Sequence, residues 1–145
     1  MRLPLHAIII GINDYPDFAT LTSAVSDAQK TQQCIKEVLK AEEKNINFLE
    51  GSAATKENII NAISSLTNRA NRNDAILFFF SGYAGRAGTD DGDEGIICPV
   101  DVSKAGGISD RLLLQLFDRV SKSCGNNIVR RTPNYPPQHS KNLRV

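Results

Sequence analysis

Two uninterrupted apolar runs constrain the fold of this chain more than any other feature of its sequence. The first extends from His6 to Ile12, and the second, from Ala75 to Phe80, is the most hydrophobic segment of the chain. A strand with one solvent-facing side alternates apolar and polar residues, whereas a strand buried on both sides is apolar throughout. Both runs therefore predict buried strands of a parallel sheet, with helices covering its two faces.

The segments between these runs carry helical and strand patterns in alternation. Residues 21 to 40 place apolar side chains at helical spacing, which predicts an amphipathic helix. Residues 45 to 50 form a short segment bounded by Gly51, which predicts a strand. Thr55 favours the N-cap position and precedes a second amphipathic helix, which is expected to end before Asn73.

The sequence after the second apolar run is less regular. Residues 81 to 95 are rich in Gly and Asp and predict a loop, while residues 96 to 100 predict a short strand that Pro99 confines to an edge or an end. Ser109 is expected to cap a third helix. The order β-α-β-α-β-loop-α predicts an α/β fold with a doubly wound, mostly parallel sheet flanked by helices.

Binding sites in such sheets form at the carboxyl ends of the strands. This rule directs attention to Asn13 and Asp14 after the first strand, and to residues 81 to 83 after the third. A binding domain of the receiver type would need clustered acidic residues after the first strand and an aspartate at the end of the third. Asp14 could serve for one of these, but Ser81 ends the third strand, so this alternative is set aside.

Composition places the chain among soluble, single-domain proteins. Its 145 residues carry a net charge of +1, which gives no general attraction to nucleic acid or to an anionic membrane. No apolar run approaches the ~20 residues of a membrane span, and no signal peptide is recognisable. Cys34, Cys98 and Cys124 lack metal-binding spacing and are expected to be reduced, buried structural thiols. We therefore expect a cytoplasmic protein without nucleic-acid or membrane partners.

The last part of the chain differs in character from the rest. Residues 129 to 145 contain three prolines, four basic residues and no acidic residue, without apolar periodicity. This composition predicts a disordered, basic, Pro-rich tail, so the domain is expected to span residues 6 to 128. No role is expected for His139, which lies in this tail. His6 stands at the amino end of its strand, where we expect a structural or surface role.

Eight short segments, in this order and spacing, resemble the caspase-like peptidases, and in particular the metacaspase branch of that family (peptidase C14). The segments are HAIIIGIN (6–13, followed by Tyr15), AVSDA (24–28), ATKENI (54–59), LFFFSG (77–82), DGDEG (91–95), CPVD (98–101), ISD (108–110) and GNNI (125–128). Together they cover roughly residues 6 to 128. The resemblance implies a caspase-like sheet, of which this chain holds only the N-terminal part.

The resemblance also implies cysteine-endopeptidase chemistry, in which a thiolate attacks the scissile carbonyl and a histidine transfers protons. In the family the histidine follows the third strand in a Ser-Gly-His-Gly segment, but this chain has Tyr83 at that position. A phenol is a poor base at neutral pH. The family's cysteine follows Gly-Asn-Asn-Ile in an Asp-x-Cys-like segment, yet no cysteine occurs after Cys124. Both catalytic residues are missing, and the chain is predicted to be proteolytically inactive.

Part of the family's substrate pocket matches. The resemblance assigns an early aspartate of the first helix, and the serine two positions before the histidine, to a pocket for basic side chains; Asp27 and Ser81 occupy these positions. The alternative for Asp27 is a purely structural one: an acidic residue in the first turn of a helix is favoured by the helix dipole, and this explains Asp27 equally well. Metacaspases often need calcium, for which Asp101 and Asp110 are the candidate ligands here. Residues 90 to 94 lack EF-hand spacing and are interpreted as a solvated acidic turn.

Two interpretations of function follow. The chain is either a non-catalytic remnant, produced by truncation, frameshift or alternative splicing of a caspase-domain gene, or a regulatory pseudo-protease that binds or dimerises with an active caspase-like partner. Without a fourth strand, the third strand at residues 75 to 80 is expected to have a free apolar edge. Such an edge favours self-association, or pairing with a caspase-like chain that donates a strand.

Overall fold

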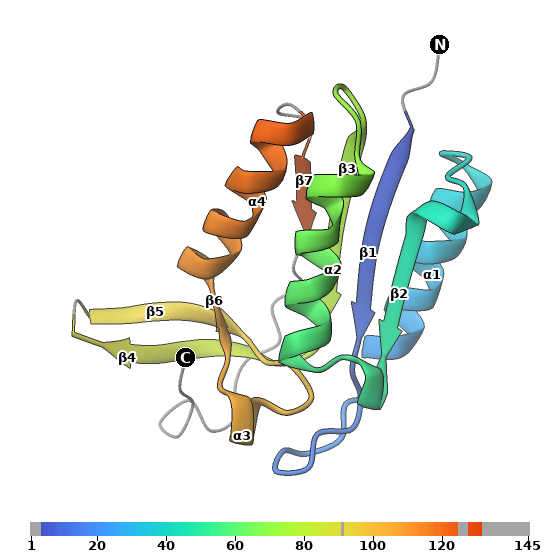
Figure 1. Ribbon diagram of the computed structural model, residues 1–145. Helices are drawn as coiled ribbons and strands as arrows, with labels where there is room; N and C mark the ends of the chain where they lie inside the picture. The colour runs from blue at the N-terminus through green and yellow to red at the C-terminus, as the bar shows by residue number, and fades with distance from the viewer. Residues whose placement is uncertain (1–3, 91, 125–127, 132–145) are drawn as a thin grey trace.

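The computed structural model describes residues 4–90, 92–124 and 128–131. Its central feature is a four-stranded parallel sheet with the strand order β2-β1-β3-β7 (Figure 1). The strands are β1 (Leu5–Gly11), β2 (Ile46–Glu50), β3 (Ala75–Ser81) and β7 (Ile128–Arg131). The two apolar runs of the sequence are therefore the neighbouring inner strands β1 and β3. The predicted α/β class with a parallel sheet is confirmed.

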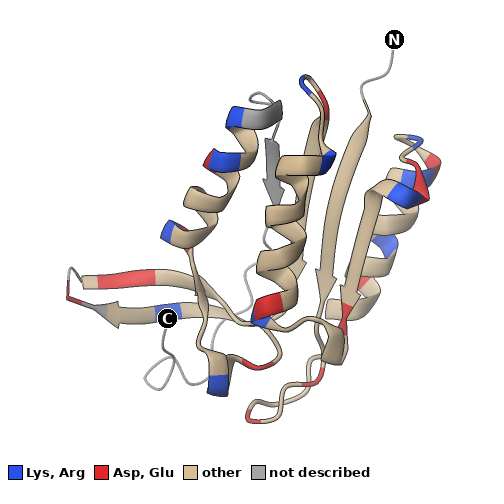
Figure 2. Ribbon diagram, viewed as in Figure 1, with Lys and Arg blue, Asp and Glu red and all other residues tan. Residues whose placement is uncertain are grey.

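Helices cover both faces of this sheet, because successive side chains of its strands point to opposite sides. The helices are α1 (Ala24–Glu37), α2 (Lys56–Arg69) and α4 (Asp110–Cys124). In Figure 1, α1 lies behind the sheet, and α2 and α4 lie in front of it. Ile9 belongs to the apolar cluster on the α1 side, whereas Phe78 and Phe80 belong to the cluster on the other side. Neither β1 nor β3 contains a Lys, Arg, Asp or Glu residue (Figure 2).

The two predicted caps are confirmed. At the start of α2, Thr55 Oγ1 accepts a hydrogen bond of 3.1 Å from the Asn58 N–H. At the start of α4, Ser109 Oγ accepts a hydrogen bond of 3.0 Å from the Leu112 N–H. Each bond satisfies an amide that has no partner inside its helix. Within the described ranges, none of the helices combines the length and apolar character that crossing a membrane requires.

A glycine at the end of β1 allows α1 to approach the sheet closely. A Cβ atom on Gly11 would stand 2.8 Å from the Ala28 Cβ and 3.0 Å from the Val25 Cα. Contacts this short do not occur between real side chains, so any larger residue at this position would push the helix away. The first turns of α1 are therefore held against the carboxyl end of β1.

The segment predicted as a loop, residues 81 to 95, contains a β-hairpin instead. Its strands and the other short elements are β4 (Ala84–Thr89), β5 (Gly92–Ile97), β6 (Ile108–Ser109), α3 (Val102–Ala105), η1 (Glu43–Asn45) and η2 (Gly51–Ala53). The three short strands form an antiparallel sheet of order β4-β5-β6. Figure 1 shows the hairpin extending away from the main sheet. The strand predicted over residues 96 to 100 is the end of β5, which stops at Ile97.

The outer edge of β3 is paired, which corrects one prediction. Strand β7 runs parallel to β3 in a register that extends from Ile76 opposite Ile128 to Phe79 opposite Arg131. The expected free edge of β3 is therefore wrong over these four positions. Residues 129 to 131, which the sequence assigns to the tail, lie in β7. Residues 132 to 145 lie outside the described part of the chain.

Candidate active site

The two segments singled out by the sequence meet at one edge of the sheet. Gly11, at the end of β1, stands opposite Ser81, at the end of β3. The Ile12 N–H then donates a hydrogen bond of 3.0 Å to the Ser81 carbonyl. The loop that contains Asn13 and the corner that contains Tyr83 therefore leave the sheet side by side. This is the edge at which parallel α/β sheets form their sites.

Tyr83, to which the resemblance assigns the histidine position, is buried in this corner, with only 3% of its surface exposed. Its hydroxyl donates a hydrogen bond of 2.8 Å to the Ala19 carbonyl. Its backbone N–H donates to the Tyr15 hydroxyl at 3.1 Å, and its carbonyl accepts from the Cys98 N–H at 2.9 Å. The side chain therefore has a structural partner at its polar tip and does not point into open solvent.

Three aromatic rings pack together around this position. The ring centroids of Tyr15 and Phe18 each lie 5.1 Å from that of Tyr83, in edge-to-face arrangements, and 5.5 Å from one another. The Tyr15 hydroxyl also donates a hydrogen bond of 2.7 Å to the Cys98 carbonyl. Burial raises the pKa of Tyr15 far above its ordinary value, so this phenol stays protonated. The rings of Tyr15, Phe18 and Tyr83 therefore fill this corner of the sheet edge.

The two pocket residues implied by the resemblance lie at the same edge of the sheet. Ser81 is fully buried at the end of β3. Asp27 lies in the first turn of α1 and is half-buried, and the start of α1 packs against Gly11, the register partner of Ser81. Asn13, the other candidate, has a local structural role, because its Oδ1 accepts a hydrogen bond of 3.1 Å from the Val25 N–H at the start of α1.

The cysteines differ in their surroundings. Cys98 is fully buried after β5, as expected, and burial raises the pKa of its thiol to about 12. It is therefore a neutral thiol at physiological pH rather than a nucleophilic thiolate. Cys34 was expected to be buried but is exposed, because it lies on the outer side of α1. The side chain of Cys124 is outside the described part of the structure.

The acidic residues proposed for calcium have other surroundings. Asp101 Oδ1 accepts a hydrogen bond of 2.9 Å from the Lys56 N–H at the start of α2, and Asp110 opens α4 with an exposed side chain. In the acidic hairpin, Asp93 is exposed, whereas Glu94 accepts a hydrogen bond of 3.0 Å from the Arg111 N–H. Among the described residues, no three His, Cys, Asp or Glu side chains gather as a metal site would require. The described acidic side chains therefore do not fit a calcium site.

If Asp101 serves to cap α2, its replacement should weaken the fold in the same way with and without calcium. We expect Asp101→Ala to lower the free energy of unfolding by about 1–2 kcal/mol, because it leaves the Lys56 amide without its partner. Urea unfolding in EDTA and in calcium measures this loss. Asp93→Ala, on the exposed hairpin, is the matched control and should change stability by less than about 0.5 kcal/mol. A loss for Asp101→Ala that appears only in calcium would contradict the capping role.

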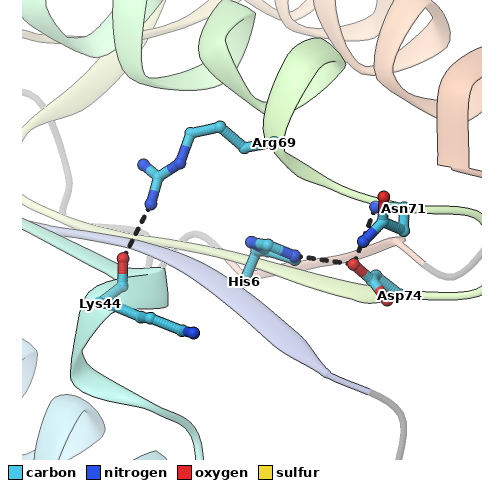
Figure 3. Close-up of polar contacts among 5 residues, drawn as sticks. All are labelled: His6, Lys44, Arg69, Asn71 and Asp74. Carbon is cyan, nitrogen blue, oxygen red and sulfur yellow. Dashed lines mark hydrogen bonds and ion pairs between the residues drawn. The ribbon is translucent and has the colours of Figure 1, made fainter.

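His6 lies at the opposite, amino end of the sheet and has a structural environment (Figure 3). It is buried, and its Nε2 lies 2.9 Å from Asp74 Oδ2. The same carboxylate oxygen accepts a hydrogen bond of 2.8 Å from the Asn71 N–H. His6 Nδ1 is buried without a hydrogen-bond partner among the described residues. The structural role expected for His6 is thus confirmed, and the surface alternative is wrong.

Comparisons with known proteins agree with this architecture. A family model for the metacaspase, peptidase C14 domain matches residues 6–129. Metacaspase-1A of Neurospora crassa is 32% identical over 127 residues, which is 80% of this chain and 27% of that protein. Metacaspase-1 of Yarrowia lipolytica is 30% identical over 118 residues, covering 74% of this chain and 26% of that protein. The chain therefore spans about a quarter of the length of these curated relatives.

A solved structure supports the fold independently. The crystal structure of protein GSU0716 from Geobacter sulfurreducens matches with a TM-score of 0.72 and 19% sequence identity, and the match covers 90% of this chain and 50% of that one. At this identity the likeness concerns the fold alone. The family match, in contrast, extends over nearly all of the described elements, from β1 into β7. We conclude that this chain belongs to the metacaspase, peptidase C14 domain family.

Proposed function

We propose that this chain is a caspase-like domain without proteolytic activity. The observation that carries the proposal is the burial and hydrogen bonding of Tyr83, to which the resemblance assigns the histidine position. Its ring is buried among Tyr15 and Phe18, and its hydroxyl donates to the Ala19 carbonyl. A general base must reach the proton that it removes, and a phenol hydroxyl that already donates a hydrogen bond is a much poorer base than an imidazole nitrogen.

The lack of a suitable nucleophile is a second, separate deficiency. Attack on a peptide carbonyl by cysteine needs a thiolate within reach of the base. Cys98 is buried and protonated, with a pKa raised to about 12, and Cys34 lies on the exposed side of α1. The segment that follows Ile128 reads Val-Arg-Arg-Thr-Pro, where the family has its Asp-x-Cys-like segment. The chain therefore lacks a suitable nucleophile as well as a suitable base, and both deficiencies support the proposed inactivity.

A turnover assay tests this proposal. The purified chain should not hydrolyse reporter peptides with arginine or lysine before the scissile bond, in calcium or in EDTA. Tyr83→His should not restore cleavage, because, of the two cysteines whose side chains the structure describes, Cys98 is buried with its thiol protonated and Cys34 lies on the outer side of α1. The matched positive control is metacaspase-1A of Neurospora crassa under the same conditions. Turnover that survives repurification, and that a thiol alkylator abolishes, would contradict the proposal; Cys34→Ser, Cys98→Ser and Cys124→Ser would then identify the nucleophile.

The alternative is a regulatory pseudo-protease that binds an active caspase-like chain. The observation that favours it is β7, which among the described residues has a hydrogen-bonded neighbour on one side only. A parallel edge strand offers main-chain donors and acceptors to a strand from another chain. Mixing this chain with an active metacaspase should then produce co-elution and a change in turnover. Separate elution with unchanged turnover would contradict this alternative.

A remnant and a pseudo-protease predict different genomic sequences. If the segment after Ile128 results from a shifted frame or an altered splice, another frame of the DNA downstream of that codon should encode an apolar strand ending in Asp-x-Cys. If the segment belongs to a pseudo-protease, no such frame should be present. Sequencing of the genomic DNA and of the transcript distinguishes the two accounts.

A further inference from the structure

Strand β2 is an edge of the main sheet. Among the described residues it has a hydrogen-bonded neighbour, β1, on one side only, and its register with β1 runs without a bulge from Ile46 to Glu50. The amino end of the strand is fixed, because the Arg69 guanidinium donates a hydrogen bond of 2.8 Å to the Lys44 carbonyl (Figure 3). Within the described structure, β2 therefore offers the backbone groups of its outer side, in a fixed position, to another strand.

Strand β2 lacks the features that commonly protect an edge. Edge strands often carry a lysine or a proline, or contain a bulge that interrupts pairing. β2 reads Ile-Asn-Phe-Leu-Glu, with its single charge at the end, and its first four residues are half-buried. Two of the three exposed large hydrophobic residues in the described structure, Val38 and Leu39 (66% and 53% exposed), lie in the connection from α1 to β2. An apolar, unprotected edge of this kind is typical of a surface that another chain covers.

The sequence of β2 is self-complementary when two copies run antiparallel. If Asn47 stands opposite Asn47 of a second copy, Ile46 of each copy stands opposite Phe48 of the other. Ile46 and Phe48 both lie on the α1 side of the sheet, so these two pairs are apolar and share one face. The two Asn47 amides meet at the two-fold axis, where each can both donate and accept a hydrogen bond. Cross-strand pairs such as these stabilise a sheet.

The charges at the two ends of β2 support the same arrangement. Lys44 directly precedes the strand and Glu50 ends it, and both side chains are exposed. Both residues are three positions from Asn47, so each Lys44 lies near Glu50 of the other copy. Within one chain the Lys44 ammonium lies 3.2 Å from Glu42 Oε2. Such an exposed pair contributes little to stability, so Lys44 can exchange this partner for Glu50 of the second copy.

We propose that β2 is the dimerisation surface of this chain, and that it pairs with β2 of a second copy, antiparallel about a two-fold axis at Asn47. The two four-stranded sheets then form one continuous sheet. Strand β7, the other edge, fits self-pairing less well: two of its four residues are arginine and none is acidic, so no register brings opposite charges together. Because the paired segment has only five residues, the interface is small and the dimer is weak and reversible.

Two charge variants of the full chain test this arrangement. In sedimentation velocity from micromolar to hundreds of micromolar concentration, the wild-type chain should show a reversible monomer–dimer equilibrium. Lys44→Glu and Glu50→Lys each place like charges at both ends of the paired strands, and each should raise the dissociation constant about tenfold or more. An equimolar mixture of the two variants should dimerise like the wild type, because opposite charges then meet at both ends. Lys122→Glu, on α4, makes the same change of net charge as Lys44→Glu and should leave the equilibrium unchanged.

A disulfide tests the register. In a Cys34→Ser, Cys124→Ser background, Asn47→Cys should give a covalent dimer on mild oxidation, because the two introduced thiols meet at the two-fold axis. Asn45→Cys is the matched control. In the proposed register the two copies of position 45 are separated by four residues, about 13 Å along the strands, whereas a disulfide spans at most about 7 Å between Cα atoms. Asn45→Cys should therefore stay largely monomeric under the same oxidation.

A chain that remains monomeric over the whole concentration range would overturn the proposal. A dimer that neither charge variant weakens would also overturn it, because the contact would then lie elsewhere, for example at β7. Monomers in which the thiol of Asn47→Cys is alkylated slowly would mean that another segment of the same chain covers β2, which contradicts the proposal as well. None of these measurements involves peptide cleavage. Failure of the dimer is therefore distinguishable from failure of the proposed inactivity.

Discussion

Truncating Phe117 should be among the most destabilising single changes in this chain. Phe117 lies on α4, is 6% exposed, and packs its ring edge-to-face on Phe78 of β3 with a centroid distance of 5.4 Å. Removing a buried phenylalanine eliminates its apolar burial and leaves a cavity, so we expect Phe117→Ala to lower the free energy of unfolding by about 3–5 kcal/mol. Urea denaturation followed by circular dichroism measures this loss.

The same helix offers a matched control. Leu114 is 60% exposed, and Leu114→Ala should change stability by no more than about 0.5 kcal/mol. The contrast tests whether α4 is docked on the main sheet in this chain, which contains about a quarter of its curated relatives. Similar, small losses for both variants would mean that α4 is not packed on β3 in solution. Two separate unfolding transitions in the wild-type chain would lead to the same conclusion.

The parts of the fold that sequence reasoning located correctly are those in which local pattern and tertiary environment agree. Strands β1 and β3 are apolar on both faces because both faces are buried, so their composition alone indicates their place in the sheet. Thr55 and Ser109 act as caps through hydrogen bonds to amides three residues away, which a local pattern can anticipate.

The hairpin and β7 were missed because their strands depend on their neighbours. Residues 84 to 89 are mostly Gly and Ala, which carry little intrinsic preference for a strand; β4 forms because its backbone pairs with β5. Strand β7 has four residues, two of them arginine, a pattern too short and too polar to be recognised. Its pairing with the outer edge of β3 determines its conformation.

The candidate site was located only in part for a similar reason. Tyr83 was identified through its position in a family segment, but its partners lie far away in the sequence: Ala19 is 64 residues earlier, and Tyr15 is 68 residues earlier. Asp101 likewise caps a helix that begins 45 residues before it. The aromatic residues Tyr15 and Phe18, placed in a turn next to a proline, were the available signal that this loop is anchored by rings.

Alkaline pH should destabilise this protein strongly through Cys98. Burial raises the pKa of its thiol from 9.0 to about 12 in the folded chain, whereas the unfolded chain exposes it to water. Between these values the unfolded state has lost a proton that the folded state retains, so stability decreases as pH rises. The stabilisation that the protonated Cys98 thiol gives the folded state is fully present below pH 9. Above pH 9 the free energy of unfolding decreases by about 1.4 kcal/mol per pH unit, which amounts to about 3 kcal/mol by pH 11. Tyr15, whose pKa burial also raises, acts in the same direction above pH 10.

The measurement is the free energy of unfolding from urea titrations at half-unit steps between pH 8 and pH 11, under reducing conditions. Cys98→Ala should be less stable than the wild type at pH 8, because it leaves a small cavity, but its stability should decrease less steeply with pH. Cys34→Ala is the matched control: this thiol is exposed, so its removal should leave the slope unchanged. Parallel curves for the wild type and Cys98→Ala would mean that the Cys98 thiol ionises equally well in the folded chain. The corner that Tyr15, Tyr83 and Cys98 build together would then be open to water.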